Sequence, residues 1–186
     1  MKTIRFTGVL IIGALILASC SSSTPSASST STTSPGSGSS TSSTTTTAVV
    51  TNSTGSAALS TVWPTCCAAN LTAIGKAAEA VGNDVTQIGK NGGSGSTAQL
   101  VKDLGTLSTA VSSGLQATST ALSQVSNAGL TSYNNALSGL RTATNNAKSG
   151  CSSTTNACLN DIQSIEGKLT SVTDTASQLN TQVTGS

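Results

Sequence analysis

Histidine is absent from all 186 residues of this chain. Serine and cysteine nucleophiles of hydrolases usually depend on a histidine base, so the Ser-His-Asp and Cys-His arrangements are excluded. The sequence also has no G-x-S-x-G elbow, no P-loop and no strand-linked G-x-G-x-x-G motif. Serine is too frequent for one nucleophile to stand out. We therefore expect a protein that is not an enzyme and that uses no cofactor.

Charge is scarce, at 8% of the residues. Lys2 and Arg5 account for the formal net charge of +2, because the rest of the chain has six basic and six acidic side chains. Nucleic-acid binding needs clustered Lys and Arg that displace counterions from phosphates, so we expect no nucleic-acid partner. Nothing positions a carboxylate pair for glycoside cleavage, and solvent exposure is the ordinary interpretation of the acidic residues. These residues are Glu79, Asp84, Asp103, Asp161, Glu166 and Asp174.

Aromatic residues are only 2% of the chain, and no proline follows Pro64. Residues 58–186 therefore lack the strongest helix breaker almost throughout. Their apolar residues recur in steps of three and four, which is the period of one buried helix face, and strand alternation never persists. We expect an all-α fold, an antiparallel bundle of three or four helices. The apolar stripes cover residues 67–88, 100–125, 133–147 and 158–183.

The first twenty residues have the outline of an export signal. Lys2 and Arg5 precede an apolar run that ends at Leu17-Ala18-Ser19-Cys20, and the run is too short to cross a bilayer. This ending resembles the lipobox of bacterial lipoprotein precursors. The resemblance covers only these residues and implies removal of a signal peptide, residues 1–19. It further implies a diacylglyceryl group on Cys20 and often acylation of its new amino group, with chains such as palmitate.

That resemblance predicts where the protein resides. Cys20 would anchor it by lipid on the exported side of a cell membrane or an outer membrane. Each buried CH₂ contributes about 0.8 kcal/mol, so two or three acyl chains hold a protein essentially permanently. The alternative is an ordinary secretory signal in which Cys20 is an incidental cysteine.

A low-complexity segment separates this leader from the helical part. Residues 21–57 contain no charged and no aromatic residue and consist mainly of Ser and Thr. Such a segment buries too little apolar surface to offset the entropy of ordering it, so we expect a disordered tether. Its role is that of a spacer or of an O-glycosylated stalk. The expected organisation is a signal peptide at 1–19, a lipidated linker at 20–57 and a helical domain at 58–186.

Four cysteines remain once Cys20 is set aside: Cys66, Cys67, Cys151 and Cys158. An even number in an exported domain favours two disulfides. We expect the first two to pair with the last two, which would join the start of the first helix to the start of the last. This pairing requires two helical passes, rather than three, between Cys67 and Cys151. Zinc motifs prefer closer ligand spacing and redox motifs usually show C-x-x-C, so we expect no metal site.

Trp63 has two interpretations. It packs over the end of the bundle, or it is an exposed interface anchor. The sequence as a whole favours a non-enzymatic envelope lipoprotein whose head has an interaction or structural role. Its partner would be an unknown envelope protein or a second copy of the chain. The alternative is a lipid-anchored carrier of a small apolar ligand, because a bundle rich in small residues can leave an apolar cavity.

Overall fold

The protein is an all-α bundle, as the apolar periodicity predicts. The computed structural model describes residues 53–91, 97–153 and 155–185, and these form helices, with no strand among them. The expected signal peptide, the expected lipid anchor at Cys20 and the linker up to residue 52 lie outside the described residues. The first helix begins at Ser53, before residue 58, where we expected the domain to start.

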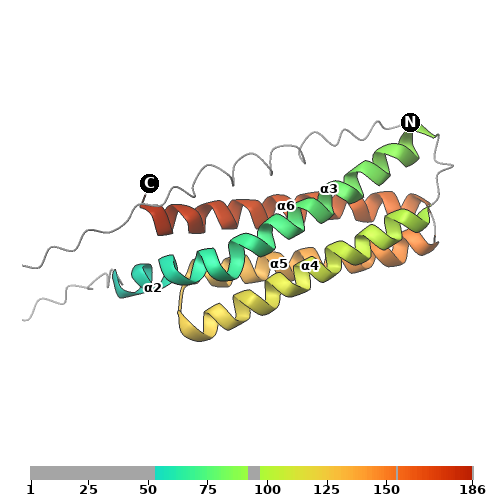
Figure 1. Cartoon of the computed structure of the whole chain (residues 1–186). Helices are drawn as coiled ribbons and strands as arrows, with labels where there is room; N and C mark the ends of the chain where they lie inside the picture. The colour runs from blue at the N-terminus through green and yellow to red at the C-terminus, as the bar shows by residue number, and fades with distance from the viewer. Residues whose placement is uncertain (1–52, 92–96, 154, 186) are drawn as a thin grey trace, which may run out of the picture.

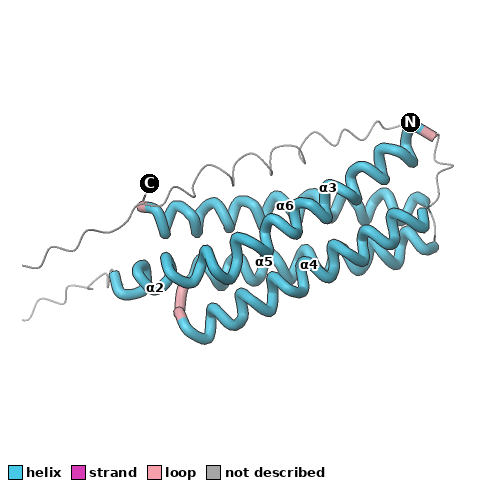
Figure 2. Tube along the Cα trace, in the orientation of Figure 1, coloured by secondary structure: helices cyan, strands magenta, loops and turns pink. Residues whose placement is uncertain are grey.

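Four rods make up the bundle (Figure 1). The first rod is continuous and consists of α2 (Ser53–Trp63), the π-helical turn η2 (Pro64–Ala68) and α3 (Ala69–Lys90). The other three rods are α4 (Thr97–Gln124), α5 (Ala128–Ser153) and α6 (Thr155–Thr184). Successive rods run in opposite directions (Figure 1), and α4 and α5 are joined by a short loop at residues 125–127 (Figure 2). Neighbours in sequence pack together, and α2 also contacts α6.

Pro64 explains why the first rod changes geometry in its middle. Proline has no amide hydrogen to donate, and its ring clashes with the carbonyl four residues earlier in a regular α-helix. The chain accommodates it through the five-residue π turn and does not break. Trp63 and Ala69, on either side of the turn, keep right-handed helical backbone angles. The rod therefore carries a local widening at η2, a type of irregularity that is frequent at functional sites.

The predicted stripes form the core between the rods. Every apolar position of the stripe at 67–88 is buried, and so are the apolar positions of the stripe at 133–147. The stripe on α4 drifts, because a helical repeat of 3.6 residues does not match a strict seven-residue pattern. Leu115 and Leu122 are consequently only half-buried, whereas Thr118 is fully buried. The Thr118 hydroxyl donates to the carbonyl of Gly114 at 2.8 Å, which satisfies the one polar group that this drift brings into the core.

Trp63 is a core residue. Its ring is 5% exposed and meets the fully buried ring of Tyr133 edge-on, with the two centroids 5.2 Å apart. Such pairs contribute about 0.5–1.5 kcal/mol beyond the area they bury. The contact joins α2 to α5 across the end of the bundle. Trp63 is thus not the exposed anchor that one of our two interpretations required.

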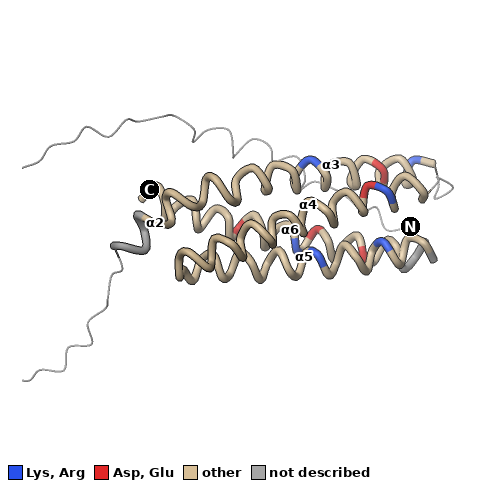
Figure 3. Tube along the Cα trace, turned by 60° about the horizontal axis from the view of Figure 1, so that its bottom comes forward, with Lys and Arg blue, Asp and Glu red and all other residues tan. Residues whose placement is uncertain are grey.

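Charged residues are confined to one part of the bundle (Figure 3). None occurs at residues 58–75, 104–140 or 175–185. Because the rods alternate in direction, these three segments meet at the end of the bundle that carries α2 and the α4–α5 connection. We call this region the uncharged end. Among the described helices, none combines the length and the apolarity that a membrane span needs.

The hydroxyl of Tyr133 is the main imperfection of the core. Its oxygen is buried and has no hydrogen-bond partner among the described residues. Burial also raises the pKa of this hydroxyl far above its usual range, so the group stays neutral. An unpaired buried hydroxyl loses its hydration without compensation and therefore destabilises the fold.

Tyr133→Phe is expected to raise the free energy of unfolding by about 1 kcal/mol, because it removes that hydroxyl and keeps the ring. The measurement is urea unfolding, read as a higher midpoint at an unchanged slope. Trp63→Phe serves as the control, since it shrinks the other ring of the pair and should lower the midpoint. A lower midpoint for Tyr133→Phe would contradict the assignment of an unpaired hydroxyl.

Candidate functional site

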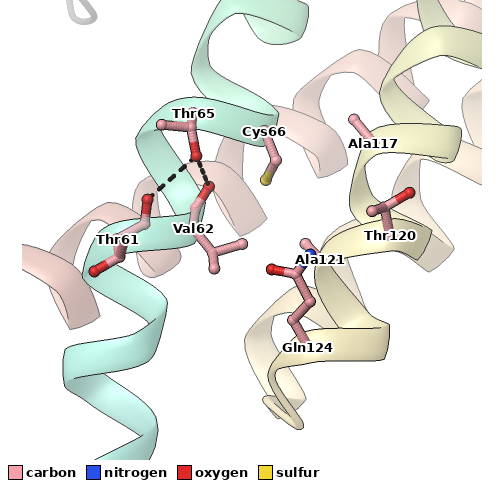
Figure 4. A pocket seen from close by; sticks show the side chains of 8 residues that line it. All are labelled: Thr61, Val62, Thr65, Cys66, Ala117, Thr120, Ala121 and Gln124. Atoms are coloured by element: carbon pink, nitrogen blue, oxygen red, sulfur yellow. Dashed lines mark hydrogen bonds between the residues drawn. The ribbon is translucent and has the colours of Figure 1, made fainter.

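A pocket lies between the first rod and α4, at the uncharged end (Figure 4). Its volume is about 280 Å³. The lining side chains supply methyl, hydroxyl and amide groups and one sulfur, and none of them is charged. They are Thr61, Val62, Thr65 and Cys66 from α2 and η2, and Ala117, Thr120, Ala121 and Gln124 from α4.

The wall formed by η2 is held by side-chain hydrogen bonds. The Thr65 hydroxyl lies 3.2 Å from the carbonyl oxygen of Thr61 and 3.0 Å from that of Val62 (Figure 4). On the other side of the turn, the Asn70 amide donates to the carbonyl of Cys66 at 2.6 Å. These side chains supply donors to carbonyls around the turn that Pro64 interrupts. The pocket wall is therefore built by local sequence, whereas the opposite wall comes from a helix about fifty residues further along the chain.

Both disulfides are local, and the pairing that we expected is wrong. Cys66 is bonded to its neighbour Cys67, and Cys151 is bonded to Cys158. The reason is topological: α3, α4 and α5 make three passes between Cys67 and Cys151. Three antiparallel passes carry the chain to the opposite end of the bundle, so these cysteines are too far apart to bond. The chain reverses direction at residues 125–127, where a single long helix would have been needed.

The two disulfides differ in their surroundings. Cys151 and Cys158 are 4% and 3% exposed, so both sulfurs of that bond are covered. In the other bond Cys67 is 1% exposed, whereas Cys66 is only half-buried and lines the pocket. The Cys66 sulfur points into the space between η2 and α4 (Figure 4). The Cys66–Cys67 bond is therefore accessible from one side and through one of its two sulfurs.

Two carboxyls meet outside the pocket, between α3 and α4. The pKa of Asp84 is raised above its ordinary value, mainly by burial. The neighbouring Asp103 raises it further, through a side-chain hydrogen bond and through its negative charge. Burial alone raises the pKa of Glu166 on α6. Glu79 and Asp174 are exposed, as we expected for the acidic residues in general. Among the described residues, no three His, Cys, Asp or Glu side chains gather closely enough to hold a metal ion.

The structure separates the residues that the sequence singled out. Cys66 lies at the pocket, and Cys67 and Trp63 lie in the core. The Cys151–Cys158 bond is at the other end of the bundle. Sequence reasoning missed the α4 wall of the pocket and the Asp84–Asp103 pair. Both depend on how two helices align with one another, and no local motif encodes that alignment. Pro64, two residues before the adjacent cysteines Cys66 and Cys67, was the one available signal.

Comparisons with protein-family models, with curated proteins and with solved structures found no match to this chain.

We compare two variants, one with Cys151 and Cys158 changed to Ala and one with Cys66 and Cys67 changed to Ala. The first is expected to lose more free energy of unfolding than the second. Chain-entropy models give about 2.5 kcal/mol for a loop with the sequence separation of 7 between Cys151 and Cys158. A ring between adjacent residues constrains the unfolded chain far less. Urea unfolding of both variants is the measurement. Equal losses in the two variants would contradict the local pairing.

Asp84→Asn is expected to stabilise the protein near neutral pH by roughly 0.5 kcal/mol, a small effect because both residues are only half-buried and water screens their interaction. The folded state binds the Asp84 proton more tightly than the unfolded chain does. Wild-type stability therefore falls as the pH rises from the ordinary pKa of 3.8 through the raised value, and this fall is absent in the variant.

Urea unfolding at about pH 7 and about pH 3 tests this expectation, because the advantage of Asp84→Asn should vanish at the lower pH. Asp174→Asn, at an exposed position of α6, is the matched control and should change stability little. If the Asp84→Asn protein is less stable than the wild type at neutral pH, the ionised Asp84 carboxylate stabilises the fold and the prediction is wrong.

Proposed function

We propose that this protein is a lipid-anchored envelope protein whose helical head has a non-enzymatic interaction or structural role. The observation that carries the proposal is the sequence Leu17-Ala18-Ser19-Cys20 after a short apolar run. It resembles a lipobox, and the long Ser/Thr segment behind it suits a spacer between a lipid anchor and a folded head. The partner is an envelope protein or a second copy of the chain.

The charge distribution of the head supports this arrangement. The first rod begins at the uncharged end, so the linker from Cys20 enters the head there. An uncharged surface near a membrane is neither repelled by anionic head groups nor drawn onto them, in contrast to a basic surface. The charged end, where α5 ends and α6 begins, would then be the end that faces away from the lipid. Charged and polar groups there are available for contact with a partner.

The alternative role, a carrier of a small apolar ligand, has weaker support. The pocket is the feature that favours it, but its volume of about 280 Å³ lies just below the usual range of ligand sites, roughly 300–1,000 Å³. Its lining includes the hydroxyl groups of three threonines and the amide of Gln124. The Thr65 and Thr120 hydroxyls donate to backbone carbonyls of their own helices, so an apolar ligand would meet a partly polar lining. The core itself is filled by side chains of all four rods.

Cys20→Ala tests the proposal in bacteria that process lipoproteins. The wild-type chain should incorporate labelled palmitate and sediment with membranes, whereas the variant should take up no label and leave the membrane fraction. Loss of the thiol removes the attachment point for the acyl chains, which supply the binding energy. Ser21→Ala is the matched control and should behave as the wild type does. A Cys20→Ala protein that stays on the membrane would refute the lipid anchor.

A further inference from the structure

The pocket exposes one sulfur of a bond between two adjacent cysteines. We propose that Cys66–Cys67 is a site of thiol–disulfide exchange, at which a low-molecular-weight thiol enters the pocket and attacks the Cys66 sulfur. The inference goes beyond the proposed function and does not depend on the lipid anchor. It rests on the access to Cys66, the burial of Cys67 and the contrast with the second disulfide.

Access decides which sulfur is attacked. Exchange requires a thiolate to approach one sulfur of the bond, so its rate depends on the exposure of that sulfur. Cys66 lines the pocket and is half-buried, whereas Cys67 is 1% exposed. The small side chain of Ala117 faces Cys66 from α4 and leaves room in front of its sulfur (Figure 4). None of the residues lining the pocket is acidic, so no carboxylate there repels an incoming thiolate.

The leaving group has a polar neighbour. The Thr118 hydroxyl oxygen lies 3.8 Å from the Cys67 sulfur in the buried interface with α4. This hydroxyl now donates to the carbonyl of Gly114, and rotation about its C–O bond would turn its hydrogen toward a Cys67 thiolate. A hydrogen bond to the charged form favours that form. Cys67 is therefore the sulfur that leaves, and Cys66 is the sulfur that carries the adduct.

The exchange balances in two steps. A thiolate forms a new S–S bond with Cys66, the Cys66–Cys67 bond breaks, and its electron pair passes to Cys67, which takes a proton from water. A second thiolate then attacks the thiol-derived sulfur of the mixed disulfide. The Cys66 thiolate leaves and is protonated, and the two small thiols depart as their disulfide. Two electrons have moved from the small thiols to the protein, and the reverse sequence restores the bond.

Opening this bond disturbs the fold little. A ring of two adjacent residues constrains the unfolded chain least of all disulfides, so its loss removes little chain-entropy stabilisation. The backbone on either side is held independently by Thr65 and by Asn70, whose hydrogen bonds do not involve the sulfurs. The bundle can therefore remain folded in the oxidised, mixed-disulfide and reduced states.

The second disulfide provides a control within the same molecule. Full-length protein is first treated with iodoacetamide to block any free thiol, and is then incubated with free cysteine and quenched with acid. Peptide mapping measures the opening of each bond over time. We expect Cys66–Cys67 to open at least about ten times faster than Cys151–Cys158, with the cysteine adduct on Cys66. Equal rates, or an adduct mainly on Cys67, would overturn the proposal.

A pair of matched variants tests the route through the pocket. Ala117→Leu places a larger side chain in front of the Cys66 sulfur and should slow the opening of Cys66–Cys67 several-fold. Ala98→Leu makes the same change at an exposed position near the start of α4 and should leave the rate unchanged. Circular dichroism checks that both variants fold. An unchanged rate of opening in a folded Ala117→Leu protein would refute attack from the pocket. If that variant fails to fold, the position of the cysteine adduct in the wild-type protein still tests the proposal.

Discussion

The fold depends on burial of the four apolar stripes, because the helices that carry them are weak on their own. Ser, Thr and Gly are frequent in all four rods, and each of these residues favours a helix less than Ala does. Ion pairs contribute little in a chain with so few charges. The helices are therefore stabilised mainly by tertiary contacts along their apolar faces. Leu104, Leu107 and Leu137 are completely buried, which shows how tightly these faces are covered.

Pro64 has effects beyond its own turn. By interrupting the first rod it produces η2, and η2 holds Cys66 at the pocket while Cys67 points into the core. Adjacent residues of a helical turn face different directions, so one can be covered while the other is accessible. The same local geometry places Trp63 against Tyr133. The access to the Cys66 sulfur and the Trp63–Tyr133 contact at the end of the bundle thus both depend on the irregular turn η2.

The proposed anchor and the proposed exchange site draw on separate parts of the chain. The anchor rests on Cys20 and its preceding residues, which are sequence features. The exchange site rests on contacts between η2 and α4, at the end of the head where the linker enters. If both hold, a reactive disulfide would sit on the membrane-proximal side of an exported head. A small thiol can reach that side freely, whereas a large partner would have to fit between the head and the lipid.

The sequence by itself determined the helical class and most of the inward face of the rods, because helical periodicity is a local property. Only the tertiary structure decided the disulfide pairing, since it depends on whether residues 125–127 turn the chain back. It also decided the pocket and the Asp84–Asp103 pair, because each needs the alignment of one helix against another. Such alignment is set by the packing of whole faces, and no short stretch of residues specifies it.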